Sequence, residues 1–171
     1  MRRRNPRLGR LASHYLPDLV YGANDGIITT FAVVSGVVGA SLANTVIVIL
    51  GLANLVADGL SMGASNYLAR RSTVEDELVP RLEAGKHGAA TILGFLAAGI
   101  LPLLAYLVPL PDDGRFAIAV VTAAAALFAV GAARTLVTRR GLLRSGLEML
   151  VVGSAAGAVA YAVGALAAAM T

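Results

Sequence analysis

Residues 51–71, GLANLVADGLSMGASNYLARR, form an apolar run interrupted by Asn54, Asp58, Met62 and Asn66 at intervals of four residues. In an α-helix this spacing places all four side chains on one face. A carboxylate in a helix of membrane-spanning length costs at least about 2.5 kcal/mol, so it normally faces a cavity, an ion path or a partner. We therefore expect this face to line a path for a cation.

The composition around this run is that of a membrane protein. Hydrophobic residues make up 57% of the 171 residues and charged residues only 14%, and the mean hydropathy is +0.76. A chain this short and apolar has too few polar side chains to cover its surface in water. We therefore predict an all-α integral membrane protein. Because cysteine is absent, any metal ligands must be oxygen, nitrogen or thioether groups.

Five apolar runs predict five transmembrane helices, at about residues 19–40, 45–68, 88–108, 116–137 and 146–170. Pro17 and Asp18 suit the start of the first helix, and Pro102 should kink the third. A basic tail (1–18) precedes this five-helix domain (19–171), and a short polar loop (69–87) connects the second and third helices.

The basic residues predict the orientation. With the amino terminus in the cytosol, Arg115 is the only basic residue outside, and the other thirteen of the fourteen lysines and arginines lie inside. The carboxyl terminus is then outside. The tail sequence MRRRNPRLGR is best explained as an orientation signal and an anchor to anionic lipid. Nucleic acid is not an expected partner, because neither an aromatic platform nor a helix-turn-helix pattern accompanies the arginines.

Asp25 and Asp58 should form the centre of the path. The first two helices are antiparallel neighbours, so both acids reach a similar depth in the cytosolic half of the bilayer. Small residues at four-residue spacing allow close helix packing: Gly22 and Gly26, Gly36 and Ala40, Gly59 and Gly63, Gly153 and Gly157. Five helices are few for enclosing a polar path, so we expect a homodimer with the path on its two-fold axis.

Three segments resemble the vacuolar iron transporter family: YGANDGIITTFAVVSGVVGA (21–40), GLANLVADGLSMGASNYLA (51–69) and, more loosely, GFLAAGILPLLAY (94–106). The resemblance implies a dimeric exporter of ferrous iron, sometimes manganese, that exchanges the ion for protons. It also implies that Asp25 is a carboxylate ligand and Met62 a thioether ligand.

The chain departs from plant members of that family at three points. It has Asn54 where they have glutamate and Thr30 where they have proline. Its 69–87 connection is also too short for their long cytosolic insert, which is rich in glutamate and methionine and binds metal before transport. Metal collection by such an insert is therefore not expected here.

The candidate metal residues are Asp25, Met62, Asp58 and Asn54. Two copies each of Asp25 and Met62 would offer two oxygen and two sulfur ligands, a mixture that suits Fe²⁺ better than Mg²⁺ or Ca²⁺. A carboxylate must lose its proton to bind metal, so Asp25 and Asp58 could couple metal release to protonation. No cofactor is expected, since Fe²⁺ or Mn²⁺ would be the transported ion.

Simpler explanations exist for these residues. Met62 could be a packing residue, Asp58 could pair with Arg70 or Arg71, and Asn54 and Asn66 could bond between helices. Glu148 suits the helix dipole at the start of the last helix. One group of loop residues could gather cations or form only a solvated face: Glu75, Asp76, Glu77, Glu83 and His87.

Two other function classes remain open. Gly59, Ser61 and Gly63 match the G-x-S-x-G pattern of serine hydrolases, but the motif lies in an apolar helical run, and His14 and His87 lie outside the spans. A passive cation channel would lack the fixed proton exchange of an antiporter. The alanine- and arginine-rich composition is associated with a bacterial plasma membrane.

Overall fold

The computed structural model describes residues 6–72, 79–109, 111, 113–135 and 141–170. These residues are helical or lie in turns and short connections, with no strand among them, which confirms the predicted all-α class. The helices are α1 (Pro6–Gly39), α2 (Asn44–Arg71), α3 (Arg81–Gly99), η1 (Leu101–Leu103), α4 (Leu104–Leu107), α5 (Arg115–Ala133) and α7 (Leu142–Met170).

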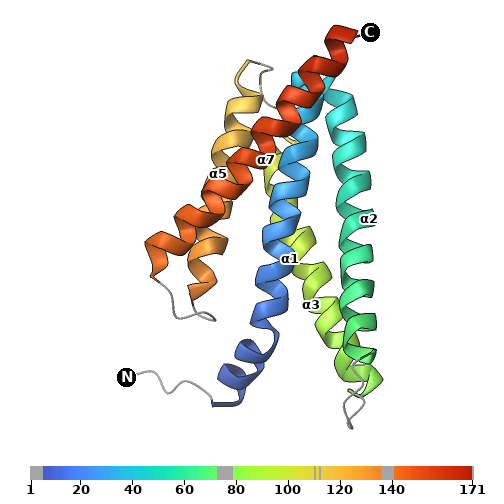
Figure 1. Ribbon diagram of the computed structural model, residues 1–171, viewed down its shortest axis with the longest axis vertical. Helices are drawn as coiled ribbons and strands as arrows, with labels where there is room; N and C mark the ends of the chain where they lie inside the picture. The colour runs from blue at the N-terminus through green and yellow to red at the C-terminus, as the bar shows by residue number, and fades with distance from the viewer. Residues whose placement is uncertain (1–5, 73–78, 110, 112, 136–140, 171) are drawn as a thin grey trace.

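Four helical segments are long and apolar enough to cross a membrane: Asn44–Arg71, Arg81–Leu107, Arg115–Ala133 and Leu142–Met170. This finding supports an integral membrane protein. The first predicted span belongs to α1, which has 34 residues and runs along the bundle beside the other helices (Figure 1). Its middle carries Asn24, Asp25, Thr29 and Thr30, so it is more polar than the four apolar segments.

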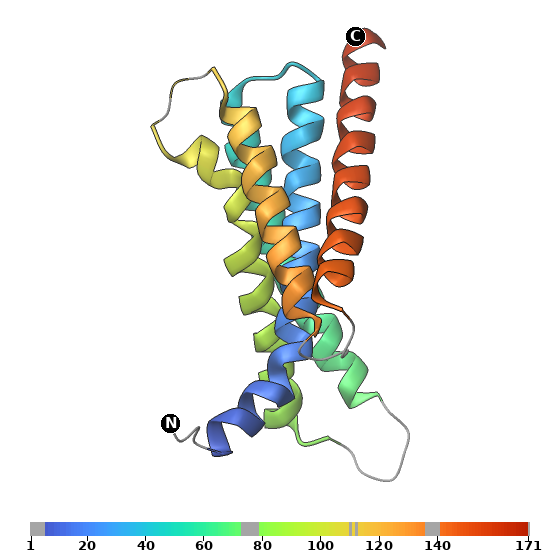
Figure 2. The same cartoon turned by 90° about the vertical axis from the view of Figure 1, so that its left-hand side faces the viewer.

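The polar helix α1 occupies the centre of the bundle. It packs against α2, α3, α5 and α7, with α2 and α3 on one side and α5 and α7 on the other (Figures 1 and 2). In a bilayer, polar side chains are tolerated where other helices shield them from lipid. The apolar helices therefore provide the environment in which α1 can keep its polar residues.

The two prolines have different effects on their helices. Pro17 was expected at a helix start but lies inside α1, which begins at Pro6. Proline interrupts one backbone hydrogen bond and commonly bends a helix without ending it, and the first turns of α1 are angled away from the rest (Figure 2). Pro102 was expected to kink the third helix, and the α-helix is replaced there by the 3₁₀ turn Leu101–Leu103.

The connection between the second and third helices is shorter than predicted. Helix α2 continues to Arg71 and α3 begins at Arg81, so the end of the predicted 69–87 loop is helical. Three of the predicted cation-gathering residues, Glu75, Asp76 and Glu77, lie outside the described residues. The same holds for Arg139 and Arg140, two of the basic residues expected on the cytosolic side.

Glycines bring α1 and α3 into backbone contact. A Cβ atom at Gly22 would collide with the Thr91 carbonyl oxygen, and one at Gly94 would collide with that of Leu19. Gly26 has the same relation to the carbonyl of Phe95. The close approach predicted from small-residue spacing is therefore present at this crossing. It depends on glycine because the obstacles are backbone atoms, which cannot rotate away.

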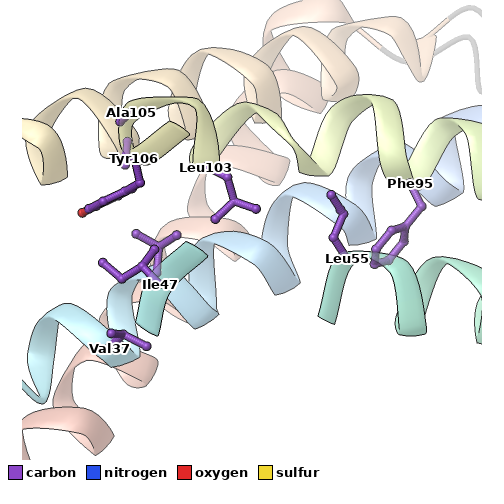
Figure 3. Packing of buried hydrophobic residues seen from close by; sticks show 9 residues of the cluster. Val37, Ile47, Leu55, Phe95, Leu103, Ala105 and Tyr106 are labelled. Atoms are coloured by element: carbon purple, nitrogen blue, oxygen red, sulfur yellow. The ribbon is translucent and has the colours of Figure 1, made fainter. Parts of the chain in front are cut away.

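One apolar core cluster lies between α1, α2 and the α3–α4 segment (Figure 3), and a second lies between α1, α3 and α5. Leu55 and Phe95 pack at one end of the first cluster, Ile47 and Tyr106 pack at the other, and Leu103 lies between them. Phe95, Ile47 and Leu103 are fully buried. This packing fixes α2 against α3 and so sets the direction in which the polar face of α2 points.

We predict that Gly94→Ala destabilises the protein by about 1–3 kcal/mol, the usual cost of overpacking, because the new methyl group meets the Leu19 carbonyl. Gly85→Ala in the same helix is the matched control, since nothing lies within 4 Å of a Cβ atom there. That variant should be neutral or up to about 1 kcal/mol more stable. Thermal unfolding of both proteins in detergent measures the difference, and equal melting temperatures would contradict the prediction.

Candidate metal path and Asp18 network

The polar residues of α2 share one face, as their spacing predicts. Asn54, Asp58, Met62 and Asn66 are all half-buried. They run beside a buried row that packs on α3 and η1 and consists of Gly51, Leu55, Gly59 and Gly63. The glycine row lets α2 approach α3 closely, and this approach turns the polar row toward the junction with α1.

Asp25 and Asp58 come together at this junction. The two half-buried carboxyl groups lie close enough to interact electrostatically. Neither has a basic group within 4.0 Å among the described residues. The Asp25 backbone carbonyl accepts a hydrogen bond from Thr29 Oγ1 at 3.0 Å, an internal helix contact that leaves the carboxylate available. Two acids at one depth, as predicted, form a place where a cation would be stabilised.

Met62 lies one helical turn farther along α2 than Asp58. It lines a pocket of about 460 Å³ between α1 and α2, together with Tyr21, Asp18 and Asn66. Met62 also packs in part against the apolar core, so packing accounts for part of its environment. Met62 therefore lies between the Asp25–Asp58 pair and the polar residues Asp18 and Asn66.

Asn54 lies one turn beyond Asp58 in the opposite direction. Its Nδ2 atom is buried and has no hydrogen-bond partner among the described residues, and the same is true of Asn24 Oδ1 and Thr30 Oγ1. Unsatisfied buried polar atoms are uncommon and usually indicate a ligand, an ion or water. An amide nitrogen cannot ligate a metal, so Asn54 would contribute through its oxygen after rotation of the amide group.

Hydrogen bonds centred on Asp18, here called the Asp18 network, connect three helices. They lie at the end of the bundle where α2 ends and α3 begins. Asp18 Oδ1 accepts hydrogen bonds from Asn66 Nδ2 at 2.7 Å and from Arg70 Nη2 at 3.0 Å. Its other oxygen lies 2.5 Å from His87 Nδ1. Asn66 also donates to Thr91 Oγ1 at 2.6 Å. One buried carboxylate therefore connects α1 to both α2 and α3.

These contacts explain the ionisation of Asp18, which precedes the apolar part of α1. Burial alone would raise the pKa of this carboxyl group, but the hydrogen bonds from His87, Asn66 and Arg70 outweigh burial and hold the pKa below its ordinary value. A lowered pKa means that folding favours the ionised form. The network is therefore intact at neutral pH and weakens as the pH falls through the range where Asp18 becomes protonated.

Asp18 was expected at a helix start, and this network was not predicted from the sequence. A usable signal was present, because Asp18 lies seven residues before Asp25 and Asn66 lies eight residues after Asp58. If two antiparallel helices pair Asp25 with Asp58, then Asp18 and Asn66 lie at nearly the same height along the helix axes.

The alternative ion pair between Asp58 and Arg70 or Arg71 is not what the structure contains. Arg70 contacts Asp18 and Asn66, and Arg71 donates to the Val79 carbonyl at 3.0 Å. Twelve residues of helix separate Asp58 from Arg70, a rise of about 18 Å. Glu148, predicted to act on a helix dipole, accepts a hydrogen bond from Arg144 at 3.2 Å one turn earlier.

The G-x-S-x-G match has no hydrolase geometry. Gly59, Ser61 and Gly63 all lie inside the continuous helix α2, where Ser61 is exposed on the side away from the buried row. A nucleophile elbow requires a sharp turn between a strand and a helix. The prediction that the chain is not an enzyme of this class therefore agrees with the fold.

Comparison with known proteins gives matches in one family. The sequence matches the VIT family over residues 16–85 and 73–165. It is 44% identical over 69 residues to the vacuolar iron transporter of Toxoplasma gondii, covering 39% of this chain and 23% of that protein. It is 39% identical over 71 residues to that of Plasmodium berghei, covering 42% and 26%.

A longer match is found in Oryza sativa subsp. japonica. There the vacuolar iron transporter homolog 1 is 29% identical over 169 residues, covering 88% of this chain and 73% of the relative. The matched segments span only about a quarter of the Toxoplasma and Plasmodium proteins. No solved structure matches the chain. Because the family match extends over nearly the whole membrane bundle, the chain belongs to the VIT family, as the resemblance of residues 21–40 and 51–69 suggested.

Proposed function

We propose that this protein exports divalent iron, manganese or both from the cytosol by proton antiport, along a path that contains Asp25, Asp58 and Met62. The observation that supports this function most directly is the juxtaposition of Asp25 and Asp58 inside a helical membrane bundle. The relatives named vacuolar iron transporters support the choice of a metal cargo.

The electrostatics of the pair favour a dication. Two ionised carboxylates at one depth repel each other, and burial weakens the solvent screening of that repulsion. A divalent ion between them replaces the repulsion by two attractions. Protons can do the same in its absence, so the pair alternates between a protonated state and a metal-bound state. This exchange is the basis of the proposed antiport.

Met62 and a second protomer complete the proposed site. A thioether is a soft ligand that favours a borderline transition-metal ion over Mg²⁺ or Ca²⁺. The α1–α2 pocket containing Met62 is partly open, and Tyr21 at its edge is 61% exposed. We propose that two copies meet along this side, so that the two-fold axis brings two Asp25 and two Met62 side chains around one ion.

The direction of export follows from the proposed orientation. Several basic residues of the described chain occur near the ends of helices on the side of the α2–α3 connection: Arg70, Arg71, Arg81, Lys86, Arg134 and Arg144. Arg115 begins α5 at the opposite end. Under the positive-inside rule the first end is cytosolic, and Met62 then lies between the cytosol and the Asp25–Asp58 pair. We place the protein in a bacterial plasma membrane on compositional grounds.

A passive divalent-cation channel is the second candidate function. The half-buried polar row on α2 is compatible with it, because a channel needs the same polar lining. The two functions differ in thermodynamics, since only an antiporter can use a proton gradient to accumulate metal.

We predict that Asp25→Ala and Met62→Ala each reduce metal flux at least tenfold, because each removes a ligand from the proposed site. The measurement is Fe²⁺ or Mn²⁺ entry into liposomes, recorded with a metal-quenched dye and a pH dye. The matched controls are Asp113→Ala on an exposed turn and Met170→Ala at the exposed end of α7. Normal flux through correctly assembled Asp25→Ala protein would refute the assignment.

We predict that Asp58→Asn lowers the accumulation of Mn²⁺ that a pH gradient can drive, because the variant keeps the side-chain shape but carries one titratable group fewer. Liposomes with an acidic lumen should concentrate Mn²⁺ above the external level with the wild-type protein and less so with the variant. An unchanged accumulation ratio would exclude Asp58 from proton exchange. Downhill flux with no accumulation by the wild type would identify a channel.

A further inference from the structure

The Asp18 network borders a second group of metal-ligating side chains. His14 on α1 and Glu83 and His87 on α3 each place one ligand atom within 4.8 Å of the other two. His14 Nε2 lies 2.9 Å from Glu83 Oε1, and His87 Nε2 lies 3.9 Å from the same oxygen. The chain has only two histidines, and the fold brings both to one carboxylate.

We infer that His14, Glu83 and His87 form a binding site for a divalent first-row transition-metal ion, separate from the Asp25–Asp58–Met62 path. Two imidazole nitrogens and one carboxylate oxygen suit ions from Mn²⁺ to Zn²⁺, whereas Mg²⁺ and Ca²⁺ prefer shells made of oxygen alone. Three protein ligands leave a coordination position for water, so the ion can exchange with solvent.

Asp18 prepares His87 for this role. An ionised carboxylate can only accept a hydrogen bond, so the 2.5 Å contact requires His87 Nδ1 to carry the proton. In the neutral imidazole the lone pair is then on Nε2, the atom that faces Glu83. Metal-ligating histidines usually donate their other ring N–H to a carboxylate in this manner, which fixes the ring and raises its basicity. His87 is 3% exposed and Asp18 is 6% exposed, so the orientation is held by packing as well.

Glu83 and His14 are positioned to close around an ion. Ligand bonds of about 2.0–2.2 Å place the donor atoms of one tetrahedral ion about 3.3–3.6 Å apart, and the two observed separations from Glu83 fall on either side of that range. Tyr15 donates to Glu83 Oε1 at 2.9 Å and Lys86 Nζ lies 3.5 Å from Oε2. Small side-chain rotations at partly exposed residues would therefore complete the site.

The site is distinct from the proposed transport path. Asp18, which holds His87, precedes Asp25 by seven residues of α1, a rise of about 10 Å. The binding site stands on the geometry of its three ligands alone. Its further role, to hold an ion at the cytosolic entrance, rests on the proposed transport function.

The test is a titration of the purified full-length protein in detergent with Co²⁺, whose visible absorption reports nitrogen and oxygen coordination. An Asp25→Ala/Met62→Ala double variant removes the proposed path ligands and serves as the background. We expect this background protein to bind one Co²⁺ per chain, and His14→Ala or Glu83→Gln to weaken that binding at least tenfold. Lys86→Ala, one turn from Glu83, is the matched control and should retain binding because it removes only a cation.

A second measurement distinguishes the loss of one metal ligand from misfolding of the variant. Pulsed electron paramagnetic resonance of bound Cu²⁺ should detect two coordinated imidazoles in the background protein and one after His14→Ala. Coordination without imidazole, or Co²⁺ binding unchanged by His14→Ala and Glu83→Gln, would overturn the inference. Those outcomes leave the transport proposal intact, since that proposal fails only if liposome flux is absent or insensitive to Asp25 and Met62.

Discussion

The close approach of α1 and α3 is the constraint on which the other features of this structure depend. Gly22, Gly26 and Gly94 allow backbone atoms of the two helices to meet. This contact places Asp18 beside His87, and the packing of α2 on α3 then brings Asp58 toward Asp25. A larger side chain at the crossing would separate the helices and disrupt both polar clusters, because helix packing in lipid relies on such short-range contacts.

The arrangement also explains how a polar helix can be stable in this bundle. Helix α1 carries Asp18, Asn24, Asp25, Thr30 and Ser35, yet Thr30 and Ser35 are essentially inaccessible and Asp18 is 6% exposed. Four apolar helical segments cover it. The cost of burying Asp18 is offset by three hydrogen-bond donors from two neighbouring helices. Asp25 and Asp58 have no comparable set of donors among the described residues, which fits the proposal that these two carboxylates bind a mobile ion.

The Asp18 network and the Asp25–Asp58 pair therefore differ in their chemistry. The Asp18 network is neutralised by Arg70 and fixed by short hydrogen bonds, so it holds α1 to the end of α2 and the start of α3. No basic group lies within 4.0 Å of Asp25 or Asp58 among the described residues, which fits the proposed exchange between protons and a dication. Met62 lies between the two levels in the α1–α2 pocket, where it can contribute a soft ligand without taking part in the structural network.

The sequence by itself determined the membrane class, the helical content and the shared face of Asn54, Asp58 and Met62, because hydropathy and helical periodicity are local properties of the chain. It also predicted that Asp25 and Asp58 would meet, since a short turn fixes the register of two antiparallel helices. Only the tertiary structure decided that α1 continues through Pro17 and that Asp18 binds His87 from a position 69 residues away. Only the packing of α1 on α3 brought His14 to Glu83 and His87. Such contacts depend on how helices cross, and crossing geometry is set by interlocking side chains and glycine gaps that no local pattern records.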